Sequence, residues 1–382
     1  MRLFHLSDLH IGLKLLNRDM REDQEYILSR ITELAAEKKP DAVLIAGDIY
    51  DKSAPSAEAV EVFDHFVEEL REAVPEAYIM MISGNHDSAA RLDCFRGVLA
   101  KQRLYMVGKP PMREGEFMEK VTLEDAYGRV HFYLLPFVRP SMVREITGVR
   151  EDGNSLSYHE AVGELIRREA VDRTERNVFV SHQFYVPSGK SAAEVERMDS
   201  EIRTVGNIDE VGAELLEPFD YAALGHIHKP MKAGSGRVRY CGTPLAASIS
   251  ETGQEKAVLM VDLEEKGKVT VTPLPLMPRR EVRVIKGNLE AVLKQGCADY
   301  VSVELTEEAD RNVIDMQDRL RLAFPNLLEI RRERVRKADY EKMAGEDALL
   351  NPFELCCLFL KEMDEEDKNI ITDVINKLKG AV

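Results

Sequence analysis

Asp220-Tyr221-Ala222-Ala223-Leu224-Gly225-His226-Ile227-His228 is the stretch of this sequence that decides the fold. The apolar run at 221–224 predicts a buried strand, and a glycine and two histidines follow it at once. In α/β folds, ligand residues lie on the loops that follow the strands, because neighbouring strand ends meet there. The stretch therefore predicts both a buried strand and a candidate metal site at its end.

The same arrangement, a short apolar run followed by a polar motif, recurs earlier in the chain. The apolar runs are 3–6, 42–46, 77–82 and 178–180, and the motifs after them are Asp8-Leu9-His10, Gly47-Asp48, Gly84-Asn85-His86-Asp87 and Ser181-His182. Each motif alone has an ordinary explanation: chance for Asp-x-His, a turn carboxylate for Gly-Asp, a core or capping histidine for the last. Together, in one order and each after a predicted strand, they indicate one shared site.

The candidate metal ligands are two aspartates, one asparagine and four histidines, namely Asp8, His10, Asp48, Asn85, His182, His226 and His228. One cation rarely takes more than about six ligands of this kind. Seven candidates without a cysteine therefore indicate two ions that share a bridging carboxylate. The sequence predicts a hydrolase with a dinuclear metal site.

The chain is organised in three blocks. Its 382 residues exceed the size at which single cores usually stop growing, so we expect roughly two or three domains. Residues 1–277 predict a catalytic domain, 278–340 a small α/β capping domain, and 341–382 a C-terminal helical segment that binds a partner. Within the first block, helices are expected at 22–37, 56–72, 89–101 and 158–172, and further strands at 130–135, 238–241, 257–263 and 268–272.

Composition favours an intracellular enzyme. The five cysteines contain no Cys-x-x-Cys pair, which argues against a disulfide framework. A first strand from Arg2 leaves no room for a signal peptide, and no apolar run approaches membrane-spanning length, so we expect a cytoplasmic protein. The net charge of −16 argues against tight DNA binding by this chain alone, although bound cations and a basic partner subunit would offset it.

The order of the motifs resembles that of the calcineurin-like metallophosphoesterases and, within that family, the SbcD-type nuclease subunits. The resemblance covers most of residues 1–260 and rests on Leu6–Gly12, Gly47–Asp51, Gly84–Ser88, Asp220–Pro230 and Tyr240–Pro244. Cys241 and Thr243 depart from it, since serines are usual at these two positions. The resemblance implies an α/β fold, a four-layer metallophosphoesterase β-sandwich flanked by helices, with the cap and the C-terminal helices added to it.

The resemblance also implies a role for each site residue. The first metal ion would take Asp8, His10, Asp48 and His228, and the second Asp48, Asn85, His182 and His226. His86 would face the substrate as a general acid or phosphate-binding group. Asp87 would orient the His86 imidazole, with a helix N-cap as its other role. Oxygen and nitrogen ligands without thiolate suit Mn²⁺, which the resemblance favours over Zn²⁺ or Fe²⁺.

The function implied is Mn²⁺-dependent exonuclease and endonuclease cleavage at DNA double-strand ends and hairpins. Two cations about 3.5–4 Å apart would neutralise the phosphodiester and activate a water. The expected partners are a second copy of the chain and an SbcC-like SMC-type ATPase, together in a heterotetramer. A stand-alone metallophosphoesterase acting on nucleotides or phosphoproteins is the alternative. A scaffold without catalysis is a third interpretation, against which the complete ligand set argues.

Two apolar patterns predict surfaces for these partners. Residues 351–379 carry two amphipathic stripes, which we expect to bind the coiled-coil base of the ATPase unless they fold back on the cap. Two other stripes are candidates for the homodimer unless they pack on the sheet, namely Leu92, Phe95 and Leu99, and Val60, Phe63, Val67 and Leu70.

Overall fold

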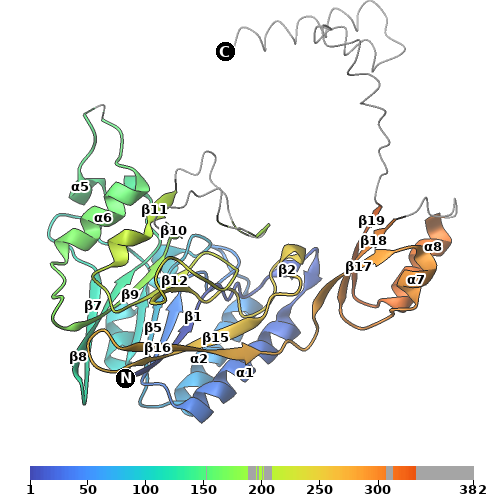
Figure 1. Ribbon diagram of the computed structural model, residues 1–382, viewed down its shortest axis with the longest axis horizontal. Helices are drawn as coiled ribbons and strands as arrows, with labels where there is room; N and C mark the ends of the chain where they lie inside the picture. Colours follow the sequence, from blue (N-terminus) through green and yellow to red (C-terminus); the bar gives the residue numbers. More distant parts are fainter. Residues whose placement is uncertain are drawn as a thin grey trace, which may run out of the picture. The chain divides into compact units, whose positions relative to one another are not determined.

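The architecture is that of a computed structural model (Figure 1). It describes residues 1–151, 153–187, 195, 198, 199, 201, 209–306 and 313–332. The described residues between Met1 and Arg332 form one compact unit. The predicted partner-binding segment at 341–382 lies outside the described residues, and the domain boundaries at 277 and 340 stay predictions.

Two six-stranded sheets form the centre of this unit (Figure 1). The first sheet has the order β16 (Val269–Leu276), β15 (Lys256–Leu263), β1 (Arg2–Leu6), β4 (Ala42–Ala46), β5 (Tyr78–Ile82) and β6 (Leu104–Val107). The second sheet has the order β13 (Met231–Lys232), β14 (Val238–Tyr240), β12 (Tyr221–Gly225), β9 (Arg176–His182), β8 (Gly128–Leu135) and β7 (Glu119–Asp125). The run β1-β4-β5-β6 is parallel, as is β14-β12-β9-β8, so these strands end at a common edge of their sheet.

An apolar core between the two sheets holds them face to face. Leu44 and Met80 of the first sheet meet Phe132 and Val180 of the second in this core, and all four are fully buried. Successive side chains of a strand point to opposite faces, so the neighbours of Leu44 in β4 enter the core on the other side, beneath the helices. Because both faces of β4 are buried, all of its residues are apolar.

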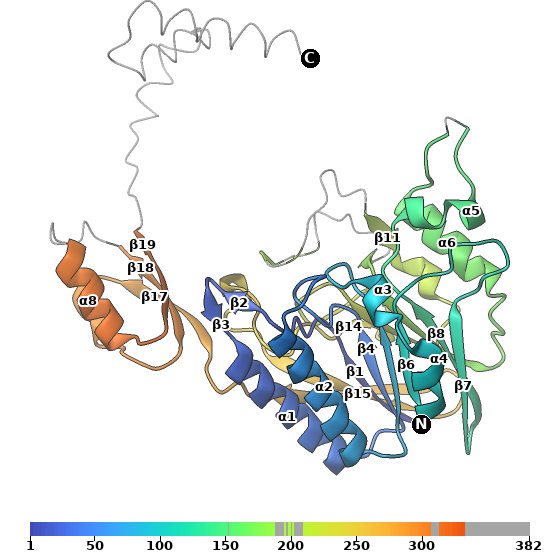
Figure 2. The ribbon, with the colours of Figure 1, turned by 180° about the vertical axis from the view of Figure 1, so that it is seen from behind.

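Helices cover the outer faces of the sheets. α1 (Arg21–Lys38) and α2 (Ala57–Ala73) lie side by side over the first sheet (Figure 2). α6 (Tyr158–Arg168) covers the second sheet, and the preceding Ser157 caps it through a reciprocal pair of hydrogen bonds with Glu160. This helix–sheet–sheet–helix order confirms the predicted four-layer α/β fold. Phe63 and Leu70 of α2 are buried in it and Val67 is partly buried against it, so of that predicted dimer stripe only Val60 is exposed.

The helix predicted at 89–101 is wrong. Two short helices replace it, α3 (Ala89–Leu92) and α4 (Arg96–Leu99). Phe95 between them has a φ of 59°, a left-handed conformation in which a helix cannot continue. Asp93 accepts a hydrogen bond from Gly108 N at 3.3 Å, which ties this turn to the end of β6. A tertiary contact therefore overrides the apolar spacing.

The prolines after position 272 do not end the last strand of the first sheet. β16 continues through Pro273 and Pro275 to Leu276, beyond the end predicted at 272. Proline lacks a backbone donor, but β16 is an edge strand, where one row of backbone groups needs no partner. The sheet then stops at Leu276, next to the predicted boundary.

Strands alternate with helices in the residues of the predicted cap, as expected of a small α/β domain. In chain order they are β17 (Val282–Gly287), α7 (Leu289–Leu293), β18 (Tyr300–Leu305), α8 (Val313–Ala323) and β19 (Leu327–Arg332). Its three strands are parallel, in the order β17-β18-β19. Asp23 of α1 contacts this part of the chain through Arg280 at 2.7 Å and through the Tyr300 hydroxyl at 2.8 Å.

Shorter elements occupy the connecting loops. They are β2 (Lys14–Leu15), β3 (Arg18–Asp19), β10 (Phe184–Val186), β11 (Glu210–Gly212), α5 (Arg144–Thr147) and 3-10 turns at Ala100–Gln102, Pro140–Met142, Ala213–Leu216 and Ile249–Glu251. None of the helices in the described ranges combines the length and the apolar character needed to span a lipid bilayer.

Candidate metal centre

The predicted ligands converge where the parallel strands of the two sheets end. The first sheet supplies Asp8 and His10 after β1, Asp48 after β4 and Asn85 after β5. The second sheet supplies His182 as the last residue of β9, and His226 and His228 after β12. The structure therefore brings all seven side chains to one place, and neither sheet alone carries the set.

Two glycines let the sheets approach closely enough to share a site. A Cβ at Gly47, whose φ is +89°, would lie 2.3 Å from Nδ1 of His182. A Cβ at Gly225 would lie 2.0 Å from the carbonyl oxygen of Ala46. Any larger residue at either position would push the two strand ends apart. This explains why both metal-site motifs begin with glycine.

Four of the candidate ligands have left-handed backbone conformations. The φ angles are 52° at Asp8, 44° at His10, 48° at Asp48 and 99° at His226. Positive φ is uncommon in residues other than glycine and is concentrated at functional sites. Here the chain turns sharply as it leaves each strand, and the ligand side chain is carried on that turn.

The first group of ligand atoms is formed by Asp8, His10 and His228. Their ligand atoms all lie within 4.8 Å of one another, and all three residues are buried. Nε2 of His10 is 3.1 Å from Nε2 of His228, and 3.8 Å from Oδ2 of Asp48. These residues, with Asp48, are the ones predicted for the first metal ion.

The second group surrounds the Asn85 amide oxygen. Oδ1 of Asn85 lies 3.0 Å from Nε2 of His182 and 2.9 Å from Nδ1 of His226. Nε2 of His182 is also 3.2 Å from Oδ2 of Asp48. Asp48 therefore contacts both groups, which is the position that a bridging carboxylate requires.

This donor set fits divalent cations. Nδ1 of His10 is buried and has no hydrogen-bond partner among the described residues, with Asp51 Oδ1 too far at 3.8 Å. The two Nε2 atoms of His10 and His228 point at each other across 3.1 Å, a place where two lone pairs would converge on one ion. Oxygen and imidazole donors without thiolate are typical of Mn²⁺, Fe²⁺ and Zn²⁺ sites of mixed ligation.

Burial and neighbouring charges shift the pKa values of two buried histidines of the centre in opposite directions. Burial lowers the pKa of His182, but the Asp48 and Asp8 carboxylates overcome this and raise it to about 9. Burial, assisted by the charge of His228, lowers the pKa of His10 to about 3. Burial would raise the pKa of Asp48, yet His182 and His10 hold it below its usual range. A proton on His182 thus neutralises Asp48, and a bound cation would take over that task.

A family model described as "Calcineurin-like phosphoesterase" matches residues 1–230, which include every one of these side chains. The chain belongs to this family. A second model, described as "Type 5 capsule protein repressor C-terminal domain", matches residues 278–364 of this phosphoesterase.

Two curated relatives are similar to this chain over most of its length. The SbcD subunit of nuclease SbcCD from Staphylococcus epidermidis is 29% identical over 336 residues, which cover 86% of this phosphoesterase and 84% of the relative. The protein of the same name from Staphylococcus saprophyticus is 29% identical over 337 residues, with the same coverage. A solved dimetal phosphatase from Danio rerio has a TM-score of 0.44 and 13% identity, covering 72% of this chain and 96% of its own. The resemblance to SbcD-type subunits is confirmed.

His86 lies at the edge of this phosphoesterase's metal centre. Its backbone N–H donates to Asp48 Oδ1 at 2.9 Å, and its Nδ1 donates to the carbonyl of Asp51 at 2.8 Å. The ring stands edge-on to His10 with 4.8 Å between centroids. Because Nδ1 is engaged, Nε2 is the nitrogen left for a substrate. One side-chain nitrogen of His86 lies within 4.8 Å of ligand atoms of His10 and Asp48, close enough to share a metal ion with them. The assignment of His86 to the substrate therefore stays a prediction.

Asp87 does not orient the His86 imidazole, which corrects the expectation for its side chain. Its carboxylate accepts backbone hydrogen bonds from Gly84 at 2.9 Å, Ile49 at 3.1 Å and Tyr50 at 2.9 Å. Ser88, not Asp87, stands at the start of α3, so the capping role is wrong as well. Burial and the nearby Asp48 raise the pKa of Asp87 to about 6. Asp87 therefore fixes the loop after β5 to the loop after β4.

Two buried acids behind His228 could not be recognised from the sequence. Glu201 Oε1 accepts from the backbone N–H of His228 at 3.0 Å, and Glu251 Oε1 accepts from its Nδ1 at 3.3 Å. They are 27 and 23 residues from His228 in sequence and belong to none of the motifs. No local signal marks them, since only the fold brings them under the site.

The two departures from the family pattern lie beneath the metal centre and not at its rim. The Cys241 thiol is 3.0 Å from the Ser7 hydroxyl, which donates in turn to Asp8. Burial raises the pKa of this thiol. The Thr243 hydroxyl donates to Glu251 at 2.8 Å. Each of these side chains is thus linked to a candidate ligand through one other residue. Ser7 links Cys241 to Asp8, and Glu251 links Thr243 to His228.

Proposed function

We propose that this phosphoesterase is the nuclease subunit of a DNA end-processing complex, cutting phosphodiester bonds with two divalent cations, most suitably Mn²⁺, in the cytoplasm. The observation that carries the proposal is the position of Asp48, 3.8 Å from His10 on one side and 3.2 Å from His182 on the other. A shared carboxylate suits a diester substrate, because the anionic phosphate resists attack until two positive charges flank it. We propose exonuclease and endonuclease action on double-strand ends and hairpins on the basis of the similarity to SbcD-type subunits.

When bound, the two cations supply charge neutralisation and an acidified water. The protein positions everything else. His86, held through Nδ1 by the Asp51 carbonyl, presents Nε2 to the leaving oxygen and donates a proton there. Asp87 keeps the loops that carry Asp48 and Asn85 at a fixed distance.

The substrate class is tested by comparing two phosphodiesters in Mn²⁺. Linear plasmid DNA and a small chromogenic phosphodiester are incubated with the same enzyme preparation, and a chelator-treated sample serves as the control. Cleavage of the plasmid supports the nuclease. Robust cleavage of the small ester with none of the plasmid would support the stand-alone metallophosphoesterase instead.

Deletion of residues from Asn351 onward tests the partner. We expect the truncated chain to lose its complex with a co-expressed SbcC-like ATPase while Mn²⁺-dependent cleavage persists, because the stripes at 351–379 lie outside the catalytic block. Co-purification and nuclease assay measure the two properties. Removal of residues 380–382 alone is the control. Binding that survives the long deletion would contradict the docking role.

Replacement of Phe95 by glutamate tests the homodimer. Phe95 is 77% exposed and Val98 of α4 is 64% exposed, an apolar surface that we propose a second copy covers. Phe95→Glu should shift sedimentation at micromolar concentration from dimer to monomer. Leu322→Glu, at another exposed apolar position in the cap, should leave the dimer intact. A wild-type monomer at that concentration would count against the assembly.

A further inference from the structure

A buried carboxylate that no metal-site motif contains lies directly behind one of the candidate ligands. Glu251, at the end of the 3-10 turn Ile249–Glu251, is 1% exposed. One of its oxygens, Oε1, is 3.3 Å from Nδ1 of His228. The opposite nitrogen of the same ring, Nε2, is the one that faces His10 in the metal centre.

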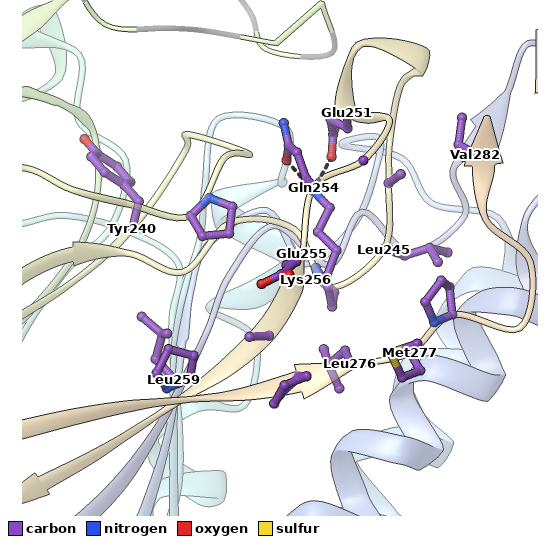
Figure 3. A pocket seen from close by; sticks show the side chains of 18 of the residues that line it. Tyr240, Leu245, Glu251, Gln254, Glu255, Lys256, Leu259, Leu276, Met277 and Val282 are labelled. Atoms are coloured by element: carbon purple, nitrogen blue, oxygen red, sulfur yellow. Dashed lines mark hydrogen bonds and ion pairs between the residues drawn. The ribbon is translucent and has the colours of Figure 1, made fainter. Parts of the chain in front are cut away.

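The second oxygen of Glu251 is held by a buried lysine. Nζ of Lys256 lies 2.6 Å from Oε2 of Glu251, 2.7 Å from the Thr243 hydroxyl and 2.9 Å from Oε1 of Gln254. Figure 3 shows Lys256 reaching between Glu251 and Gln254 at the wall of a cavity of about 680 Å³. The same Nζ is 3.3 Å from the backbone carbonyl of His228. Lys256 thus holds both the carboxylate and the backbone of the ligand that the carboxylate contacts.

This arrangement fits the needs of a metal-binding imidazole. A carboxylate that accepts the Nδ1 proton keeps the ring in the tautomer with a lone pair on Nε2, fixes the ring plane and makes Nε2 a stronger donor. A carboxylate buried without a counter-charge would be very costly, and Lys256 supplies that charge. The alternative is that the ion pair only stabilises the fold.

We propose that Glu251 is a positioning residue for His228, and that Lys256 holds Glu251 in place. The inference rests on the proposed function, because it requires a cation at the group formed by Asp8, His10 and His228. It adds a line of three residues, His228–Glu251–Lys256, that runs from the metal centre to the wall of the cavity.

The test measures Mn²⁺ binding to the full chain by calorimetric titration of chelator-treated protein. Glu251→Gln keeps the size of the side chain and an acceptor oxygen but removes the charge. We expect one of the two Mn²⁺ ions to bind roughly 10–100-fold more weakly, with the other unchanged. Unchanged binding of both ions would overturn the inference. Wild-type protein that binds no Mn²⁺ would overturn the proposed function itself.

A double variant separates positioning from stability. Glu251→Gln leaves Lys256 buried without its counter-charge, so the melting temperature should fall. Adding Lys256→Met removes that charge and should restore the melting temperature, yet Mn²⁺ binding should stay weak because His228 still lacks its carboxylate. Recovery of Mn²⁺ binding in the double variant would show that the pair acts only through stability, and the inference would fail.

Asp220 offers a matched control. It is a buried aspartate immediately before β12, the strand that leads to His226 and His228, and it is paired with Lys266 at 2.8 Å. Asp220→Asn should lower the melting temperature as Glu251→Gln does, but leave the affinity for both Mn²⁺ ions unchanged. Weaker Mn²⁺ binding in this control would make the Glu251 effect non-specific and count against the inference.

Discussion

Replacing Asp48 with alanine is expected to remove both metal ions and to reduce DNA cleavage to background. Asp48 contacts both ligand groups, through His10 at 3.8 Å and His182 at 3.2 Å. Its Oδ1 also accepts from the backbone of His86 at 2.9 Å, so its loss loosens the loop after β5. Metal analysis of the purified variant, together with a nuclease assay in Mn²⁺, measures both effects.

A companion variant separates charge from backbone strain. Asp48 has a φ of 48°, which asparagine tolerates better than alanine. Asp48→Asn should therefore fold more stably than Asp48→Ala and still lose both ions, because an amide bridges two cations poorly. Asp262→Ala, which removes a partly exposed partner of Arg2, is the control and should keep full activity. Retention of one tightly bound ion by both Asp48 variants would argue against a bridging role.

Replacing His86 with alanine is expected to lower turnover by roughly 10²–10⁴-fold while metal content stays near normal. The side chain is half-buried at the edge of the metal centre, and its Nδ1 is already engaged by the Asp51 carbonyl. What the variant loses is the proton that Nε2 would donate to the leaving oxygen. Single-turnover cleavage and metal analysis on the same preparation decide the point.

The exposed His65 on α2 provides the control for this variant. It pairs only with its helix neighbour Glu69, at 3.2 Å, among the contacts of the described residues, and His65→Ala should change neither property. His86→Ala protein that arrives stripped of metal would make His86 a ligand, a role that its closeness to His10 and Asp48 also permits.

The fold was predictable wherever both faces of an element are buried. β4 was predicted at its observed bounds, because its five residues are all apolar and all buried. Between 89 and 101 the prediction failed, since apolar spacing describes one face of a helix but says nothing about the Asp93–Gly108 contact that turns the chain at Phe95. The end of β16 was predicted four residues too early for a related reason. Prolines are tolerated in β16 only because it lies at the edge of the sheet, which the sequence alone does not show.

The sequence predicted which candidate ligands lie together better than it predicted their individual contacts. Candidate ligands such as Asn85 and His226 follow strands whose ends must meet, so position in sequence implies position in space. The contacts of Asp87 and Glu251 depend instead on which loop lies above which. The resemblance implied that Asp87 serves His86, whereas the fold places three backbone amides against the Asp87 carboxylate.

The left-handed backbone at Asp8, His10 and Asp48 has a consequence for the evolution of this centre. Aspartate, asparagine and histidine enter that region several times more readily than other residues with side chains. A cysteine or glutamate placed there would carry a backbone cost of about 1–2 kcal/mol at each position, before any change in metal affinity is counted. Aspartate, asparagine and histidine are therefore the residues that cost least at these positions, and all three offer oxygen or nitrogen donors. The backbone conformation thereby disfavours conversion into a thiolate-rich zinc centre.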